Sequence, residues 1–83
     1  MNLNDTISLM NSVDYKNRFK AEYFQTKIRY KKLLNMMKKW QKGELDFVPD
    51  CPYNLYEKQL YAMVEYLDVL ETRAEIEGIC LNT

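Results

Sequence analysis

The chain of 83 residues contains no histidine and only two cysteines, Cys51 and Cys80. Zinc sites and Cys–His catalytic pairs need such residues in close groups, so the composition argues against both kinds of site. If one straight helix separates the two cysteines, they lie roughly 40 Å apart, beyond the reach of an intramolecular disulfide. We therefore expect free thiols in a reducing cytosol, unless the cysteines bond between subunits, and we expect no metal and no other cofactor.

Glycine and proline are also scarce, with two of each, whereas 47% of the residues are hydrophobic. So few turn-forming residues argue against a sheet-rich or disordered chain and favour an all-α fold. The N-terminus shows no basic region followed by an apolar run, and no window is apolar enough to span a membrane. We expect a cytoplasmic protein without membrane contact.

Net charge is absent as well, but the two halves of the chain differ strongly. Residues 1–43 hold ten Lys or Arg against three carboxylates, and residues 44–83 hold two Lys or Arg against nine carboxylates. The first half is therefore basic and the second half acidic, which makes the chain a charge dipole along its sequence.

The basic half is dominated by a stretch without glycine or proline, for which we predict a long helix over residues 14–42. Its apolar residues alternate at spacings of four and three, the pattern of a helix packed lengthwise on another helix. These residues are Phe19, Tyr23, Thr26, Tyr30, Leu33, Met37 and Trp40.

The acidic half repeats this pattern, which predicts a second helix over residues 52–77. Its members are Tyr56, Leu60, Met63, Leu67, Leu70 and Ala74. Two such helices joined by a connector over residues 43–51 form an antiparallel hairpin, with Leu33 near Met63. A short helix over residues 5–11 completes a single domain spanning residues 1–83. In the connector, we expect Leu45, Phe47 and Val48 to cover the hairpin end against Trp40 and Tyr56.

A second series on the acidic helix also steps by four and three, and it consists of Ala62, Tyr66, Val69, Arg73 and Ile76. Together the two series make too wide an apolar arc for one partner helix to cover. Either the N-terminal segment or another subunit packs there. Because that segment is short, we favour a homo-oligomer that forms a helical bundle.

The lysines of the long helix have two interpretations. Six of them form one stripe beside its apolar seam: Lys16, Lys20, Lys27, Lys31, Lys38 and Lys42. The hairpin register places Lys38 near Glu57, Lys27 near Asp68 or Glu71, and Lys20 near Glu75, so ion pairing within the fold explains part of the stripe. The cations at other angles, Arg18, Arg29, Lys32 and Lys39, have few local counter-charges.

Cations beside flat rings are what a phosphate-bearing ligand with a base requires. Our candidate ligand-binding residues are Tyr15, Arg18, Lys20, Tyr23, Lys27 and Arg29. The acidic second half disfavours extended nucleic acid, so a compact anion suits the chain better. The sequence contains no nucleophile beside a base, no Gly-rich phosphate loop and no isolated carboxylate pair, which argues against an enzyme.

The run from Gln59 to Arg73, QLYAMVEYLDVLETR, is preceded by Arg18, Glu22 and Leu33 in the long helix. It resembles a pattern of short helical-hairpin proteins from phages and prophages of Firmicutes and from crAss-like phages. In these proteins a Q-x-x-A-M-x-x-Y-x-x-x-L-x-x-R stretch closes the hairpin. That group is similar to the hairpin domain of sponges, phage proteins that sequester nucleotide signals of CBASS and Thoeris immunity.

The resemblance implies an oligomeric helical protein in the cytoplasm of a bacterial host that binds a cyclic oligonucleotide or related phosphate-bearing messenger without turnover. Two alternatives remain open. One is a small inhibitor that contacts a host defence protein directly, as anti-CRISPR proteins do. The other is a structural or accessory phage protein whose second series of apolar residues serves only for assembly.

Overall fold

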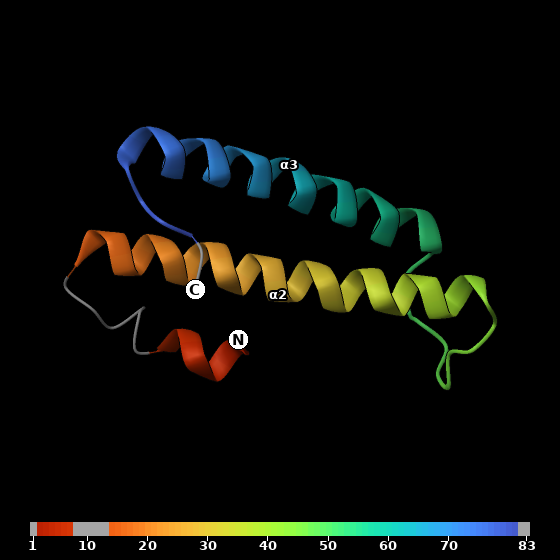
Figure 1. The fold of residues 1–83 in the computed structure, drawn as a ribbon. Helices are drawn as coiled ribbons and strands as arrows, with labels where there is room; N and C mark the ends of the chain where they lie inside the picture. Colours follow the sequence, from red (N-terminus) through yellow and green to blue (C-terminus); the bar gives the residue numbers. More distant parts are fainter. Residues whose placement is uncertain (1, 8–13, 82–83) are drawn as a thin grey trace.

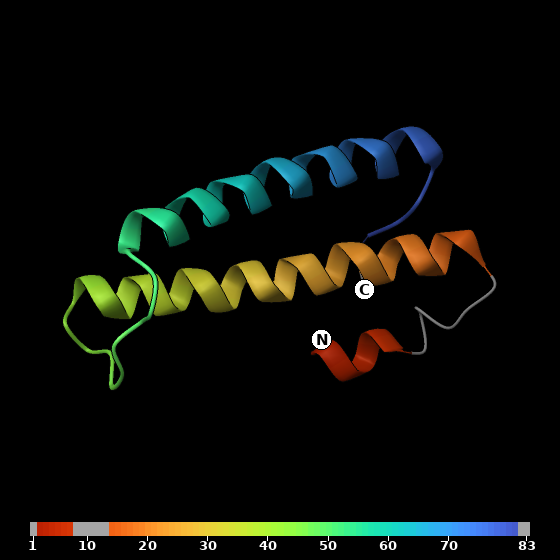
Figure 2. The same ribbon diagram turned by 180° about the vertical axis from the view of Figure 1, so that it is seen from behind.

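The computed structural model describes residues 2–7 and 14–81, which contain three helical elements (Figure 1). These are the 3-10 helix η1 (Leu3–Thr6), the long helix α2 (Tyr15–Gln41) and helix α3 (Tyr53–Glu77). Helices α2 and α3 run antiparallel as one hairpin (Figure 1 and Figure 2). The described residues form no strand, so the prediction of an all-α hairpin is confirmed.

Helix α2 begins and ends where its local sequence provides caps. The Asp14 side chain accepts a hydrogen bond of 2.9 Å from the backbone N–H of Lys16, which satisfies one of the free donors of the first turn. At the other end, Gly43 has φ +69°, a left-handed conformation that glycine adopts without steric cost. The predicted range of 14–42 exceeds the observed helix by one residue at each end.

Helix α3 also has a glycine at its C-terminal end. Pro52 is its N-cap residue, and the left-handed Gly78 closes it at φ +71°. The backbone N–H of Ile79 then donates to the carbonyl of Ala74 at 2.8 Å, which turns the chain back toward α2. Because of this turn, the side chain of Ile79 is buried in the core.

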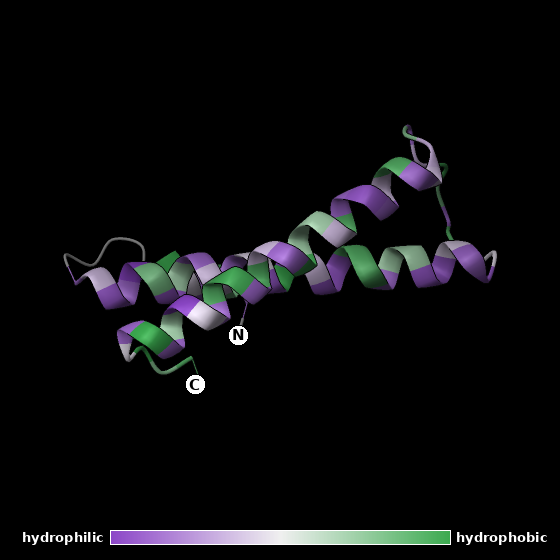
Figure 3. Ribbon diagram, turned by 90° about the horizontal axis from the view of Figure 1, so that it is seen from above, coloured by the Kyte–Doolittle hydropathy of each residue, from purple (hydrophilic) through white to green (hydrophobic). Residues whose placement is uncertain are grey.

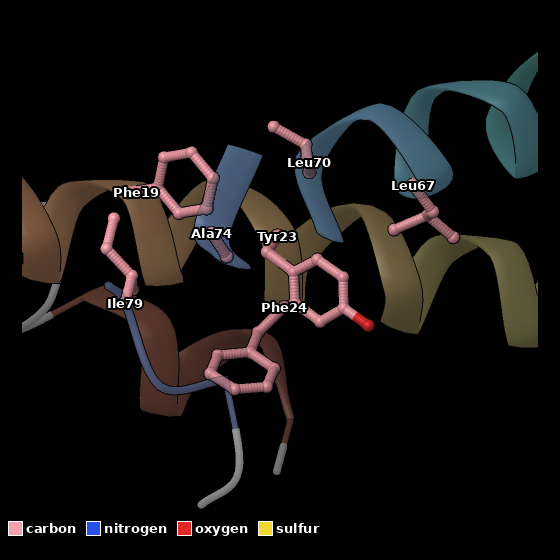
Figure 4. Close-up of a cluster of buried hydrophobic side chains, with 7 residues drawn as sticks. All are labelled: Phe19, Tyr23, Phe24, Leu67, Leu70, Ala74 and Ile79. Atoms are coloured by element: carbon pink, nitrogen blue, oxygen red, sulfur yellow. The ribbon is translucent and has the colours of Figure 1, made fainter. Parts of the chain in front are cut away.

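The main core lies at the open end of the hairpin, which is the end opposite the connector (Figure 4). Figure 3 shows α3 crossing α2 obliquely, with the connector end of α3 directed away from α2. Most of this core was predicted from the two seams, but Phe24 and Ile79 were not. The core residues are Phe19, Tyr23, Phe24, Leu67, Leu70, Ala74 and Ile79.

The connector departs from our expectation. Phe47 is 53% exposed and Val48 is 90% exposed, so the prediction that both cover the hairpin end is wrong. Trp40 instead packs edge-on against Tyr53 and Tyr56, with ring centroids 5.1 and 6.0 Å apart. These aromatic contacts fill the connector end with side chains of the helices themselves.

In the described N-terminal segment, η1 packs on α2 and makes no recorded contact with α3. Thr6 is fully buried, and its hydroxyl accepts a hydrogen bond of 3.0 Å from the Gln25 side chain. The described N-terminal helix is the single turn of η1, and residues 8–11 of the predicted helix over 5–11 lie outside the described residues. We considered either the N-terminal segment or another subunit as the cover of the outer face of α3. The described N-terminal residues do not cover this face.

Candidate functional site

Four side chains meet at the open end of the hairpin, and we call them the open-end cluster: Tyr15, Phe19, Arg73 and Glu77. The Tyr15 hydroxyl donates to Oε1 of Glu77 at 2.8 Å, and Nη2 of Arg73 donates to the Tyr15 oxygen at 2.9 Å. Nε of Arg73 lies 3.3 Å from Oε2 of Glu77. The guanidinium carbon of Arg73 lies 5.0 Å from the centroid of the Phe19 ring, which gives it a cation–π contact.

The cluster changes the acidity of its members. The hydrogen bond to Glu77, followed by partial burial, raises the pKa of the Tyr15 hydroxyl above its usual 10.0. Burial alone would lower the pKa of Arg73, but the charges and hydrogen bonds of Tyr15 and Glu77 raise it overall. The cluster therefore holds a neutral phenol and a charged guanidinium in fixed positions at neutral pH.

Two of the predicted ligand-binding residues, Tyr23 and Lys27, take part in contacts within the hairpin. Tyr23 is only 3% exposed, and its hydroxyl donates to Oε1 of Glu71 at 2.6 Å. Nζ of Lys27 lies 3.2 Å from the same hydroxyl and 5.4 Å from the ring centroid. The ring of Tyr23 thus belongs to the core of the single chain, and Tyr15, with 46% exposure, offers the more accessible ring.

The raised pKa of the Tyr23 hydroxyl leads us to predict that the stability of the fold depends on pH. Burial, and then the hydrogen bond to Glu71, raises its pKa above the usual 10.0 in the folded state. As the pH rises past 10, the unfolded chain therefore loses this proton first, and the free energy of unfolding falls. We expect Tyr23→Phe to be about 1 kcal/mol less stable at neutral pH because it loses a buried hydrogen bond.

At pH values above the usual pKa of tyrosine, the difference in the free energy of unfolding between wild type and Tyr23→Phe should become smaller. Urea unfolding of both proteins between about pH 8 and 11 measures this difference. A difference in the free energy of unfolding that stays constant over this pH range would contradict the assignment of the raised pKa to Tyr23.

The remaining candidates lie on α2, where Arg18 and Arg29 are exposed and Lys20 is half-buried. Within residues 2–7 and 14–81, the structure records an ion pair between Arg73 and Glu77 but none of the predicted lysine–carboxylate pairs across the hairpin. Lys27 reaches Glu71 only through the Tyr23 hydroxyl. Fewer lysines of α2 therefore form ion pairs with α3 than the sequence predicted.

The predicted interface series lies on the side of α3 that its partner helix leaves exposed. Tyr66, Val69 and Ile76 are 41%, 55% and 80% exposed, and Ala62 is also exposed. Leu55 and Gln59 continue the same alternation toward the N-terminus of the helix. We call the full set the α3 stripe: Leu55, Gln59, Ala62, Tyr66, Val69, Arg73 and Ile76. Figure 3 shows hydrophobic residues recurring along this helix.

Arg73 belongs to both regions. It occupies an α3 stripe position, yet its guanidinium reaches across the hairpin to Tyr15 at the start of α2. The structure thus brings together one residue predicted for ligand binding and one predicted for subunit contact. The predicted hairpin register already placed the start of α2 beside the end of α3. From this register alone, the sequence could have predicted that side chains of the two helices meet in the open-end cluster.

Other kinds of site find no support in the described part of the chain. Across residues 2–7 and 14–81, no group of three or more Cys, Asp or Glu side chains is arranged to hold a metal ion. None of the described helices combines the length and the apolar character needed to cross a bilayer. Cys51 is half-buried and Cys80 is exposed, and neither takes part in a disulfide within the described residues.

The architecture and its open-end cluster define the class of the protein as an all-α helical hairpin with a basic helix packed on an acidic one. Residues 13–76 match the model of the Sequestin family, and the chain belongs to that family. The match includes every candidate ligand-binding and interface residue named above. The name of the family indicates proteins that sequester another molecule. No curated protein and no solved structure matches the chain.

Proposed function

We propose that this chain is a phage-derived counter-defence protein that captures a cyclic nucleotide-type immune signal in a bacterial host and holds it without turnover. The observation that carries the proposal is membership of the Sequestin family, because the family name indicates sequestration. The sequence resemblance to phage hairpin proteins related to nucleotide sponges supports the same assignment and adds the phage origin.

The charge of α2 supports an anionic ligand. Arg18 and Arg29 are exposed on this helix, and Tyr15 presents a half-exposed ring beside the fixed guanidinium of Arg73. Guanidinium groups bind phosphate in a bidentate manner, and an aromatic ring stacks on a base. The acidic α3 repels a long phosphate backbone, so a compact messenger fits the hairpin better than extended nucleic acid.

We also propose that a second copy of the chain covers the α3 stripe. A two-fold antiparallel pairing of α3 with itself places Ala62 opposite Val69 of the second copy and Leu55 opposite Ile76. A small residue then faces a larger one, and longer apolar residues meet at the ends. The stripe runs almost the whole length of α3, from Leu55 to Ile76, so the contact would be long enough to hold a dimer.

Calorimetry of the full chain with cyclic di- and trinucleotides and with ADP-ribose tests the capture. We expect saturable binding of at least one compound, weakened about tenfold by Arg29→Gln through the loss of a charge-assisted phosphate contact. Lys58→Gln is the matched control, because it removes one exposed positive charge from the acidic helix instead. A folded protein that binds none of the compounds would overturn the proposal.

The α3 stripe favours one alternative, a small inhibitor that docks on a host defence protein. In that case the chain would remain monomeric, bind no nucleotide and form a stable complex with its target. Assembly without nucleotide binding would instead indicate the structural or accessory role.

A further inference from the structure

A hollow of about 330 Å³ lies where the connector runs beside the last turns of α2, and we call it the connector pocket. Helix α2 contributes Lys32, Asn35, Met36 and Lys39, and the connector contributes residues 44–47. Small-molecule sites measure about 300 to 1,000 Å³, so this volume suits a ligand of the size of one nucleotide. None of the six predicted ligand-binding residues lines it.

The glycine turn that ends α2 builds this pocket. The backbone N–H of Gly43 donates to the carbonyl of Trp40 at 3.0 Å, and that of Glu44 donates to the carbonyl of Lys39 at 2.8 Å. This pair of bonds closes the helix and turns the chain back along it. Figure 1 and Figure 2 show the first part of the connector on the side of α2 away from α3, before the chain passes α2 to reach α3. The pocket therefore uses a surface that the hairpin contact leaves accessible.

The α2 wall of the pocket carries two cations on one face. Lys32 and Lys39 are seven residues apart, about two turns, so both side chains project in nearly the same direction. The structure records no ion pair or hydrogen bond between either ammonium group and any residue in 2–7 or 14–81. This arrangement offers a phosphate group two positive charges at once.

The other lining groups fit the remainder of a nucleotide. The ring of Phe47 is 53% exposed at the pocket, and such a ring binds a base by stacking. The Asn35 amide can both donate and accept hydrogen bonds, and the carboxylates of Glu44 and Asp46 accept them. Carboxylates repel a bare polyphosphate, but they accept hydrogen bonds from ribose hydroxyls and amino groups. The lining therefore selects a ligand that carries hydroxyl or amino groups as well as phosphate.

We propose that the connector pocket is a nucleotide-binding site, in which Lys32 and Lys39 hold the phosphate and Phe47 stacks on the base. This inference deepens the proposed function and rests on it for the biological ligand. It adds a site at the connector end, separate from the candidates at the open end.

The direct test is NMR of the isotope-labelled full chain titrated with AMP, which carries one base, one ribose and one phosphate. We expect saturable shifts of the amides of Asn35 and Met36 and of residues 44–47, with smaller shifts from adenosine or inorganic phosphate alone. Shifts confined to the open-end cluster, or no saturable shift at all, would overturn the pocket assignment.

Variants then separate the pocket from the capture activity. Lys32→Ala/Lys39→Ala and Phe47→Ala are each expected to weaken AMP binding about tenfold or more, because each removes a main contact. Lys31→Ala/Lys38→Ala is the matched control, with the same charge change and spacing on the same helix but outside this lining. Circular dichroism checks that all variants fold. Unchanged AMP affinity in both pocket variants would overturn the inference.

The two proposals fail differently. If the wild type captures a cyclic oligonucleotide but both pocket variants bind AMP as tightly as the wild type, the pocket inference fails and the proposed function stands. If AMP binds at the pocket while no messenger in the calorimetric panel binds, the proposed function fails and the pocket stands as a nucleotide site.

Discussion

The Leu70→Asp variant is expected to be unfolded at room temperature. Leu70 of α3 is fully buried in the open-end core, to which α2 contributes the aromatic residues Phe19, Tyr23 and Phe24. A carboxylate there loses its hydration without gaining a partner and leaves the space of the leucine side chain poorly filled, at a cost of several kcal/mol. An 83-residue domain has a total free energy of unfolding of roughly 4 to 12 kcal/mol, so this cost removes most or all of it.

Circular dichroism and urea unfolding measure this effect. Thr72→Asp is the control, because it introduces the same carboxylate two residues away at an exposed position. The control should retain helicity and most of its stability, whereas Leu70→Asp should show neither a helical spectrum nor a cooperative transition. A cooperative transition near that of the wild type would show that the open-end core does not stabilise the hairpin.

The Val69→Asp variant, changed at the neighbouring residue, is expected to dissociate the oligomer and to leave the hairpin folded. Val69 is 55% exposed in the single chain and lies in the middle of the α3 stripe. In the proposed pairing it faces Ala62 of the second copy, so an aspartate would be buried there without a partner in the assembled state only. We expect a loss of association of at least about a hundredfold, from a penalty of roughly 3 kcal/mol.

Sedimentation over a range of protein concentrations measures the assembly, and circular dichroism measures helicity. Val48→Asp is a closely matched control, because it makes the same substitution at a connector residue that is 90% exposed. Val69→Asp should sediment as a monomer with the helicity of the wild type. Equal masses for wild type, variant and control would show that the α3 stripe is not a subunit interface.

Leu70 is buried and the neighbouring Val69 is exposed, and this contrast shows what could be predicted from the sequence. Spacings of four and three define which side of a helix is apolar, and Gly43 and Gly78 mark where the helices end. The register also followed from the pattern, because Tyr23 meets Glu71 and Gln41 meets Tyr53 close to the positions implied by Leu33 beside Met63. These features depend on local periodicity, which a single sequence contains.

Features that depend on chain reversal were not predicted. Ile79 reaches the core only because the turn at Gly78 folds the last residues back, and Phe24 is buried from a side of α2 that the seam does not include. The connector pocket likewise depends on the path after Gly43, and apolar composition alone suggested that Phe47 and Val48 were covered. The path of a connector depends on backbone hydrogen bonds that residue spacing does not specify.

The candidate site was predicted in part. The basic residues of α2 were identified by charge, but their assignment to ion pairs with α3 assumed that long side chains take the shortest path to a carboxylate. Exposed pairs of this kind gain little free energy, so a hydroxyl such as that of Tyr23 can take the carboxylate instead. Arg73 was placed at an interface by spacing, whereas its reach across the hairpin depends on the side-chain conformation.

Sequestration is the central claim, and it is most directly tested by recovering the ligand. The full chain is incubated with a messenger that it binds in calorimetry, freed of unbound ligand by gel filtration, and denatured by heat. Mass spectrometry then identifies and counts what is released. Capture without turnover predicts release of the intact messenger in fixed stoichiometry after prolonged incubation. A hydrolysed product, or no ligand retained through gel filtration, would contradict it.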